Sequence, residues 1–112
     1  MEIRFERRES VTIVSIEGSV DGATAPEATA SFRGEAQEGR VRLIGDLAGC
    51  DYMSSAGLRA LLETVKDARR RGGDLRLAAV RPEVLRVLEL SGFTGILKVY
   101  PDVASAAESF SA

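Results

Sequence analysis

The start of the chain alternates between apolar and polar positions. Ile3 and Phe5 are separated and flanked by charged residues, and a period of two is typical of a strand with one buried face. The next segment, VTIVSIEG (11–18), is rich in β-branched residues and ends at a glycine, which predicts a second strand. Only a short polar break at Glu9 and Ser10 separates the two segments, so we expect them to form a hairpin or to pair as neighbours.

From Ser55 onward the hydrophobic period lengthens to that of an amphipathic helix. Charged residues fall on the side opposite the apolar stripe, as expected for a helix that packs against a core. Three arginines, 69–71, occupy the last turn, where they offset the negative end of the helix dipole. Gly72 and Gly73 then supply the stop. The apolar stripe consists of Leu58, Leu61, Leu62, Val65 and Ala68.

A helix is also predicted after the second strand, in VDGATAPEATASF (20–32). Thr24 and Glu27 have the spacing of a capping box, and Pro26 falls in the first turn, where its missing N–H costs nothing. Its apolar stripe would consist of Ala28, Phe32 and Ala36.

The remaining segments continue the alternation of strand and helix. Strands are predicted at RVRLIGDL (40–47), DLRLAAV (74–80) and ILKVY (96–100), with a turn at AGCD (48–51). Further helices are expected to begin at Pro82 and after Pro101. The pattern predicts an α/β fold in a single domain, with a mixed β-sheet of about five strands and helices packed against it.

Length and charge limit the classes of function. A chain of 112 residues is long enough for one hydrophobic core and too short for two. The formal net charge of −2 provides no attraction toward phosphate backbones, so we expect no direct nucleic-acid partner. No window approaches the ~20 apolar residues of a spanning helix, and the start does not resemble a signal peptide. We therefore expect no membrane insertion and a cytoplasmic location.

The supply of reactive side chains is equally restrictive. The chain has no histidine and its only cysteine is Cys50, so a Ser-His-Asp triad, an intrachain disulfide and a thiolate metal cage cannot be built. Cys50 is expected to be a small buried hydrophobe. We expect no metal, no cofactor and no enzymatic activity.

Ser54 and Ser55, at the start of the central helix, are the most informative polar pair. In one interpretation, one serine caps the helix by accepting an N–H bond from the first turn. A cap is usually reinforced by Glu or Gln three residues on, yet Gly57 and Leu58 occupy those places. A glycine there favours a close approach of another chain or group to the backbone.

A second interpretation is that the same pair forms a switch. With Ala56 and Gly57, the two serines form a surface of small, uncharged residues at the positive end of the helix. A phosphate attached there would meet free N–H groups and a favourable dipole, so binding would change while the fold is kept.

Hydrolysis and nucleotide binding receive little support from the motifs. Gly57 satisfies one place of a G-x-S-x-G elbow around Ser55, but Met53 holds the other. RRGGDL (70–75) is no phosphate loop, and the chain contains no G-x-G-x-x-G.

Two long motifs resemble a known family. DLAGCDYMSSAGLRALL (46–62), followed by RRGGDLRLAAVRPEVLRVLELSGF (70–93), is similar to the STAS domain of bacterial anti-anti-sigma factors, also called anti-sigma factor antagonists. IEGSVDGATAP (16–26) resembles the family's second strand and the turn after it. The resemblance covers essentially the whole chain and implies one STAS domain over residues 1–112.

The resemblance implies a mechanism of partner switching. Family members bind an anti-sigma factor that is also a serine kinase, and so release a sigma factor for transcription. The kinase phosphorylates a serine at the start of the central helix, which ends the binding, and a metal-dependent serine phosphatase restores it. The alternative is a STAS scaffold without a phosphosite, as a subunit of a signalling complex or of a membrane transport system.

Carried over residue by residue, the family's phosphorylated serine falls on Ser55. The aspartate that often precedes it falls on Ser54, because this chain has MSSAGL where better-studied members have Asp-Ser-Ser or Asp-Ser-Thr. Ser54 is therefore a second candidate for phosphorylation. The residues expected to bind the partner are Asp21, Thr24, Ser54, Ser55, Ala56 and Gly57.

Several neighbouring residues have two open interpretations. Asp21 is either a turn former before Gly22 or an acidic neighbour of the phosphosite. Asp46 matches the aspartate that ends the family's preceding strand, or else only satisfies N–H groups of the next turn. The arginines 69–71 form a solvated helix end or aid docking. Of Tyr52 and Met53, one is expected in the core and the other at the surface.

Overall fold

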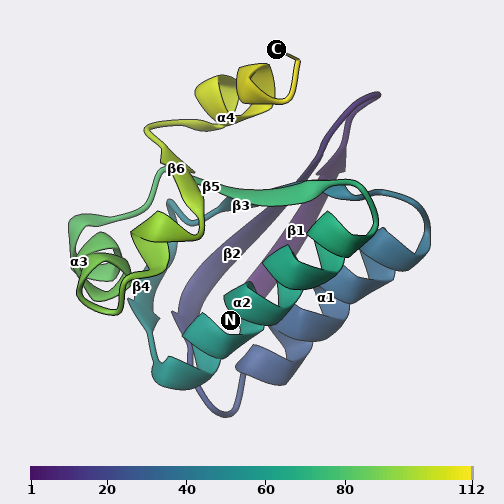
Figure 1. The fold of residues 1–112 in the computed structure, drawn as a ribbon. Helices are drawn as coiled ribbons and strands as arrows, with labels where there is room; N and C mark the ends of the chain where they lie inside the picture. Colours follow the sequence, from purple (N-terminus) through teal and green to yellow (C-terminus); the bar gives the residue numbers. More distant parts are fainter. Residues whose placement is uncertain (112) are drawn as a thin grey trace.

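A mixed sheet of six strands forms the centre of the protein in the computed structural model, which describes residues 1–111 (Figure 1). The strand order is β1-β2-β3-β5-β6, and β4 pairs separately with β2. The strands are β1 (Glu2–Arg7), β2 (Thr12–Val20), β3 (Arg42–Asp46), β4 (Cys50–Met53), β5 (Asp74–Ala78) and β6 (Lys98–Tyr100). The helices are α1 (Ala25–Gln37), α2 (Ser55–Arg70), α3 (Pro82–Leu90) and α4 (Val103–Ser109), with a 3₁₀ turn η1 (Phe93–Gly95).

The predicted α/β class is confirmed. The sheet has six strands, one more than the expected number of about five. β1 and β2 form the predicted antiparallel hairpin, from Glu2 opposite Glu17 to Arg7 opposite Thr12. The additional strand is β4, whose first two residues lie in the turn that the sequence predicts at 48–51. All pairings other than β1 with β2 are parallel.

The strand β2 is long enough to have two successive partners along one side. Its first half pairs with β3 and its second half pairs with β4. The register shifts between Gly18 and Ser19, where Gly18 has a φ of +95° that a glycine adopts without strain. As a result, β2 and β4 end side by side at Val20 and Met53.

Helices α1 and α2 lie side by side against one face of the sheet (Figure 1). Their predicted apolar stripes are buried there, apart from Leu62, which is only partly buried. Helix α4 covers part of the opposite face, where Ala106 packs with Ile13 and Ile44. Burial of these side chains supplies the main stabilisation of the fold.

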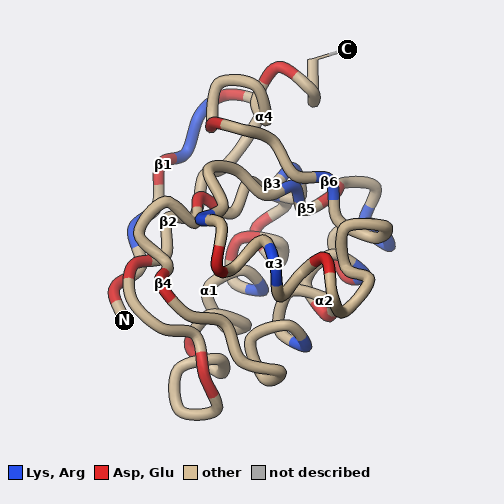
Figure 2. Tube along the Cα trace, turned by 90° about the vertical axis from the view of Figure 1, so that its left-hand side faces the viewer, with Lys and Arg blue, Asp and Glu red and all other residues tan. Residues whose placement is uncertain are grey.

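Acidic and basic residues are interspersed over the chain rather than gathered on one side (Figure 2). The arginines at the end of α2 are paired rather than merely solvated. Arg70 and Arg71 contact Asp67, while Arg69 bridges Asp74 and the carbonyl oxygen of Ile96. The Arg69 contacts tie the end of α2 to β5 and to the segment before β6, whereas the pairs with Asp67 lie within the last turns of α2.

Glu35 is a buried carboxylate that joins three segments of the chain. Its side chain accepts two hydrogen bonds of 2.8 Å from Arg7 at the end of β1 and one of 2.9 Å from Arg40 after α1. The residue is only 4% exposed. The Arg7 guanidinium, with help from Arg40, lowers the pKa of Glu35 to about 2, so the carboxylate stays ionised and paired.

Replacing Glu35 by glutamine should reduce stability in a pH-dependent way. At pH 7 we expect Glu35→Gln to lower the free energy of unfolding by about 2 kcal/mol, because the negative charge and one of the two oxygens that accept from the guanidinium groups are lost. The folded-state pKa is depressed, so the contribution is fully present above the usual value of 4.5 and is lost as the pH falls through about 2.

Urea unfolding of the wild type and of Glu35→Gln at pH 7 and pH 3 measures the difference in their free energies of unfolding. This difference should be smaller at pH 3. The matched control is Glu38→Gln, an exposed residue at the end of the same helix, which should change stability by less than about 0.5 kcal/mol. Equal losses in the two variants would contradict the assigned role of Glu35.

Candidate functional site

The start of α2 lies at the edge of the sheet where β2 and β4 end. The N–H of Ser54 donates to the carbonyl oxygen of Val20 at 2.9 Å, which fixes the first turn of α2 beside the end of β2. The loop from Asp21 to Thr24 follows directly from Val20. The structure thus brings together two of the segments that the sequence predicts to bind a partner.

Ser54 is the N-cap of α2. Its backbone is extended, its hydroxyl oxygen accepts a hydrogen bond from the N–H of Gly57 at 3.4 Å, and its carbonyl oxygen accepts from Leu58 at 2.9 Å. The side chain is partly buried. The capping interpretation is therefore confirmed for Ser54.

Ser55 occupies a different environment from its neighbour. It is the first residue of α2 and is exposed. Within residues 1–111, its hydroxyl makes no hydrogen bond to another side chain or to the backbone. The first N–H groups of a helix have no intrahelical acceptor, and the stretch from Tyr52 to Leu58 carries no charged side chain. Ser55 thus presents an accessible hydroxyl at the positive end of a helix dipole.

The loop after β2 is held in shape by Asp21 and Thr24. One carboxylate oxygen of Asp21 accepts from the N–H groups of Thr24 at 3.1 Å and Ala23 at 3.0 Å. These backbone bonds lower the pKa of Asp21 from its ordinary value. The role of Asp21 as a turn former is therefore confirmed, while its action beside a phosphosite stays a prediction.

The capping box predicted for Thr24 and Glu27 is wrong. The Thr24 hydroxyl makes no capping bond to α1. It instead donates to the carbonyl oxygen of Ser19 at 2.8 Å and accepts from the N–H of Asp21 at 2.9 Å. The reason is that Thr24 has a helix-like backbone, with φ −103° and ψ −20°, rather than the extended one that a capping side chain needs.

Gly57 is closely approached, but by this chain and not by a partner. It is buried, and a Cβ on it would lie 2.9 Å from the carbonyl oxygen of Val20 and would collide with the sulfur of Met53. The expectation that the glycine admits another chain is thus corrected: it allows α2 to pack on the ends of β2 and β4. Ala56 is only partly buried, so part of its surface is accessible to a partner.

The other candidate residues divide between structural and surface positions. Asp46 accepts from the N–H of Ala48 and the hydroxyl of Ser15, each at 3.1 Å, which confirms the turn interpretation. Tyr52 is 54% exposed, whereas Met53 is in the core, as the sequence predicts. Cys50 is fully buried, and burial raises the pKa of its thiol.

One contact at this edge was missed from the sequence. The hydroxyl of Ser19 donates to the carboxylate of Asp51 at 3.2 Å, which ties β2 to β4 just beyond the register shift. No sequence signal marked this pair, because neither residue belongs to a periodic stripe.

No three His, Cys, Asp or Glu side chains in residues 1–111 gather closely enough to hold a metal ion. No helix in the same range has the length and apolar character needed to cross a bilayer.

Comparison with known proteins identifies the family. The model of the STAS domain matches residues 2–106, and the chain belongs to this family. A curated relative is BtrV of Bordetella bronchiseptica, a proposed anti-sigma factor antagonist. It is 34% identical over 110 residues, which cover 98% of this chain and 95% of BtrV.

Solved structures share the fold over nearly the whole chain. An anti-sigma factor antagonist from Mycobacterium paratuberculosis superposes with a TM-score of 0.90 at 23% identity, covering 99% of this chain and 94% of the other. The phosphorylated form of the Bacillus cell fate determinant SpoIIAA superposes with a TM-score of 0.75 at 16% identity, covering 96% and 98%. At these identities the two structures support the fold alone.

The two serines should differ in their effect on stability. Ser54→Ala removes the N-cap acceptor and should lower the free energy of unfolding by about 1 kcal/mol. Ser55→Ala removes an unbonded, exposed hydroxyl and should change stability by less than about 0.5 kcal/mol. Urea unfolding of both variants measures the contrast, and a larger loss for Ser55→Ala would contradict the assignment of the cap.

Adding a methyl group at Gly57 should be costly. Gly57→Ala should lower the free energy of unfolding by about 2 kcal/mol, because the backbone oxygen of Val20 cannot move away without disturbing the sheet. The matched control is Gly34→Ala in α1, where a Cβ would meet open space. That variant should stabilise the protein by about 0.5–1 kcal/mol. Thermal unfolding of the pair checks the prediction, which fails if both substitutions stabilise.

Proposed function

We propose that this protein is an anti-sigma factor antagonist of the partner-switching type. In its unmodified form it binds an anti-sigma factor that is also a serine kinase, and thereby releases a sigma factor in the cytoplasm. Phosphorylation of Ser55 ends the complex, and a serine phosphatase restores the binding form. The docking face consists of the loop from Asp21 to Thr24 and the residues from Ser54 to Ala56.

The observation that carries the proposal is the exposed, unbonded hydroxyl of Ser55 at the first position of α2. A kinase must reach the acceptor oxygen, and this hydroxyl is open to solvent. Full-length similarity to BtrV supports the same class of function. Ser54 is the weaker candidate, because its oxygen is already engaged as the helix cap.

The effect of a phosphate follows from its charge. At pH 7 a phosphoserine carries about −1.5 to −2 charges. At Ser55 this charge would meet the positive end of α2 and the free N–H groups of its first turn, so the fold accommodates it. The stretch from Tyr52 to Leu58 carries no charged side chain. A partner that covers it would have to bury the dianion, at a cost of several kcal/mol in a dry interface.

Phosphorylation by the kinase provides the direct test. The purified protein is incubated with ATP and, in separate reactions, each purified serine-kinase anti-sigma factor encoded in the same genome. Mass spectrometry of the digested product should find one phosphate on Ser55. Ser55→Ala should remove the modification, and phosphate confined to residues other than Ser54 and Ser55 would reject the site.

Binding to the same kinases tests the switch. Ser55→Ala should retain the affinity of the unmodified protein, whereas Ser55→Asp should lose at least about tenfold, since a carboxylate introduces part of the phosphate's charge. Isothermal titration calorimetry gives both values. Equal affinities for the two variants would refute the switch.

A further inference from the structure

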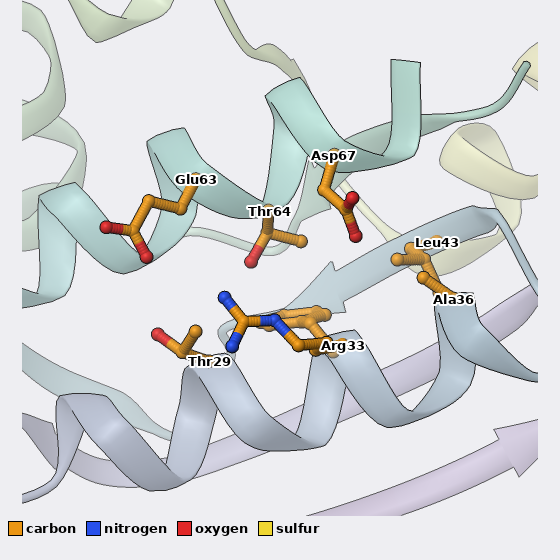
Figure 3. Close-up of a pocket in the computed structure, with 8 residues that line it drawn as sticks. Thr29, Arg33, Ala36, Leu43, Glu63, Thr64 and Asp67 are labelled. Atoms are coloured by element: carbon orange, nitrogen blue, oxygen red, sulfur yellow. The ribbon is translucent and has the colours of Figure 1, made fainter. Parts of the chain in front are cut away.

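A groove between α1 and α2 begins at the proposed docking face and continues away from it. It has a volume of about 410 Å³, and Gly22 and Ala56 line it beside the docking face. Small side chains, among them Ala30 and Ala60, line it between the two helices. Farther along the two helices, residues of α1 and α2 together with Leu43 of β3 line a small pocket of about 10 Å³ (Figure 3). A partner covering Ser55 and the loop after β2 would therefore also lie over this groove.

The wall of the groove carries two arginines that lack a carboxylate partner. Arg33 on α1 and Arg59 on α2 are exposed. Neither lies within 4.0 Å of an acidic side chain in residues 1–111, in contrast to the arginines at the end of α2. An exposed guanidinium at the edge of an apolar surface is a common anchor for a partner's carboxylate.

Glu63 is the one acidic residue in the lining of the groove. Figure 3 shows Arg33 extending from α1 toward α2 on the side where Glu63 and Thr64 lie. Glu63 makes no ion pair within 4.0 Å in the described chain, and one carboxylate balances at most one of the two guanidinium groups. The groove therefore has an excess of one positive charge, and Arg59 lies nearer than Glu63 to the docking face along α2.

We propose that this groove receives an apolar side chain of the anti-sigma factor, flanked by a carboxylate that pairs with Arg59. The inference rests on the proposed function and adds a specificity-determining residue outside the phosphosite. The small residues between the helices provide the space for the apolar side chain, and Arg59 selects the acidic neighbour. A basic segment is disfavoured at the same place, because like charges repel across an interface.

Binding measurements with matched variants test the groove. Each purified serine-kinase anti-sigma factor encoded in the same genome is titrated into the wild type and four variants. Arg59→Glu reverses the charge and Ala30→Phe fills the space between the helices. Arg86→Glu on α3 and Ala104→Phe on α4 make the same changes at exposed positions outside the groove. Arg59→Gln is the second charge variant, used if circular dichroism shows that Arg59→Glu does not fold.

We expect both groove variants to lose about tenfold or more in affinity. A loss of this size corresponds to one close ion pair in Arg59→Glu, or to one blocked apolar contact in Ala30→Phe. Both controls should stay within about twofold. The loss from Arg59→Glu should shrink in higher salt, as screening requires. If the wild type binds and both groove variants match their controls, the groove proposal is overturned while the proposed function stands. If the wild type binds none of the kinases, both proposals fail.

Discussion

The parallel pairing of β2 with β4 is the constraint on which the site depends. Because β2 shifts register at Gly18, its second half can take β4 as a new neighbour after its first half has paired with β3. The hydrogen bond from Ser54 to Val20 then fixes the start of α2 at the same edge. Gly57 permits the close approach that this bond requires. The capping bond of Ser54 and the exposure of Ser55 thus depend on where the sheet places the first turn of α2.

Two adjacent serines at this edge have separate roles in the structure. Ser54 stabilises the helix by accepting a backbone bond, while Ser55 is exposed at the surface. A modification of Ser55 therefore leaves the cap untouched. The loop after β2 is held by internal bonds of Asp21 and Thr24, so a partner that docks there as proposed would meet a preformed face, with little ordering entropy opposing the binding.

The sequence predicted the parts of the fold that periodicity determines. The hairpin, the stripes of α1 and α2 and the start of α2 at Ser55 all follow from local patterns. The strand β4 was missed because two of its four residues are exposed, so it has no apolar run. Its conformation comes from pairing with β2, which a local pattern does not contain.

Contacts between side chains that are distant in the sequence also could not be predicted from local patterns. Glu35 looks like a surface residue within α1, yet it is buried because Arg7 and Arg40 arrive from other segments. A glycine in the first turn of a helix is unusual, but the local sequence does not show that the neighbours of Gly57 are Val20 and Met53. Whether a contact is internal or external depends on the tertiary arrangement.

The free hydroxyl of Ser55 has a consequence for the lifetime of the protein in a cell. Within residues 1–111 that side chain makes no hydrogen bond, so the proposed cycles of modification would break no internal bond and would not raise the fraction of unfolded chains. Degradation in cells acts largely on unfolded or locally opened chains. If Ser55 is modified as proposed, the protein could pass through many such cycles before proteolysis removes it.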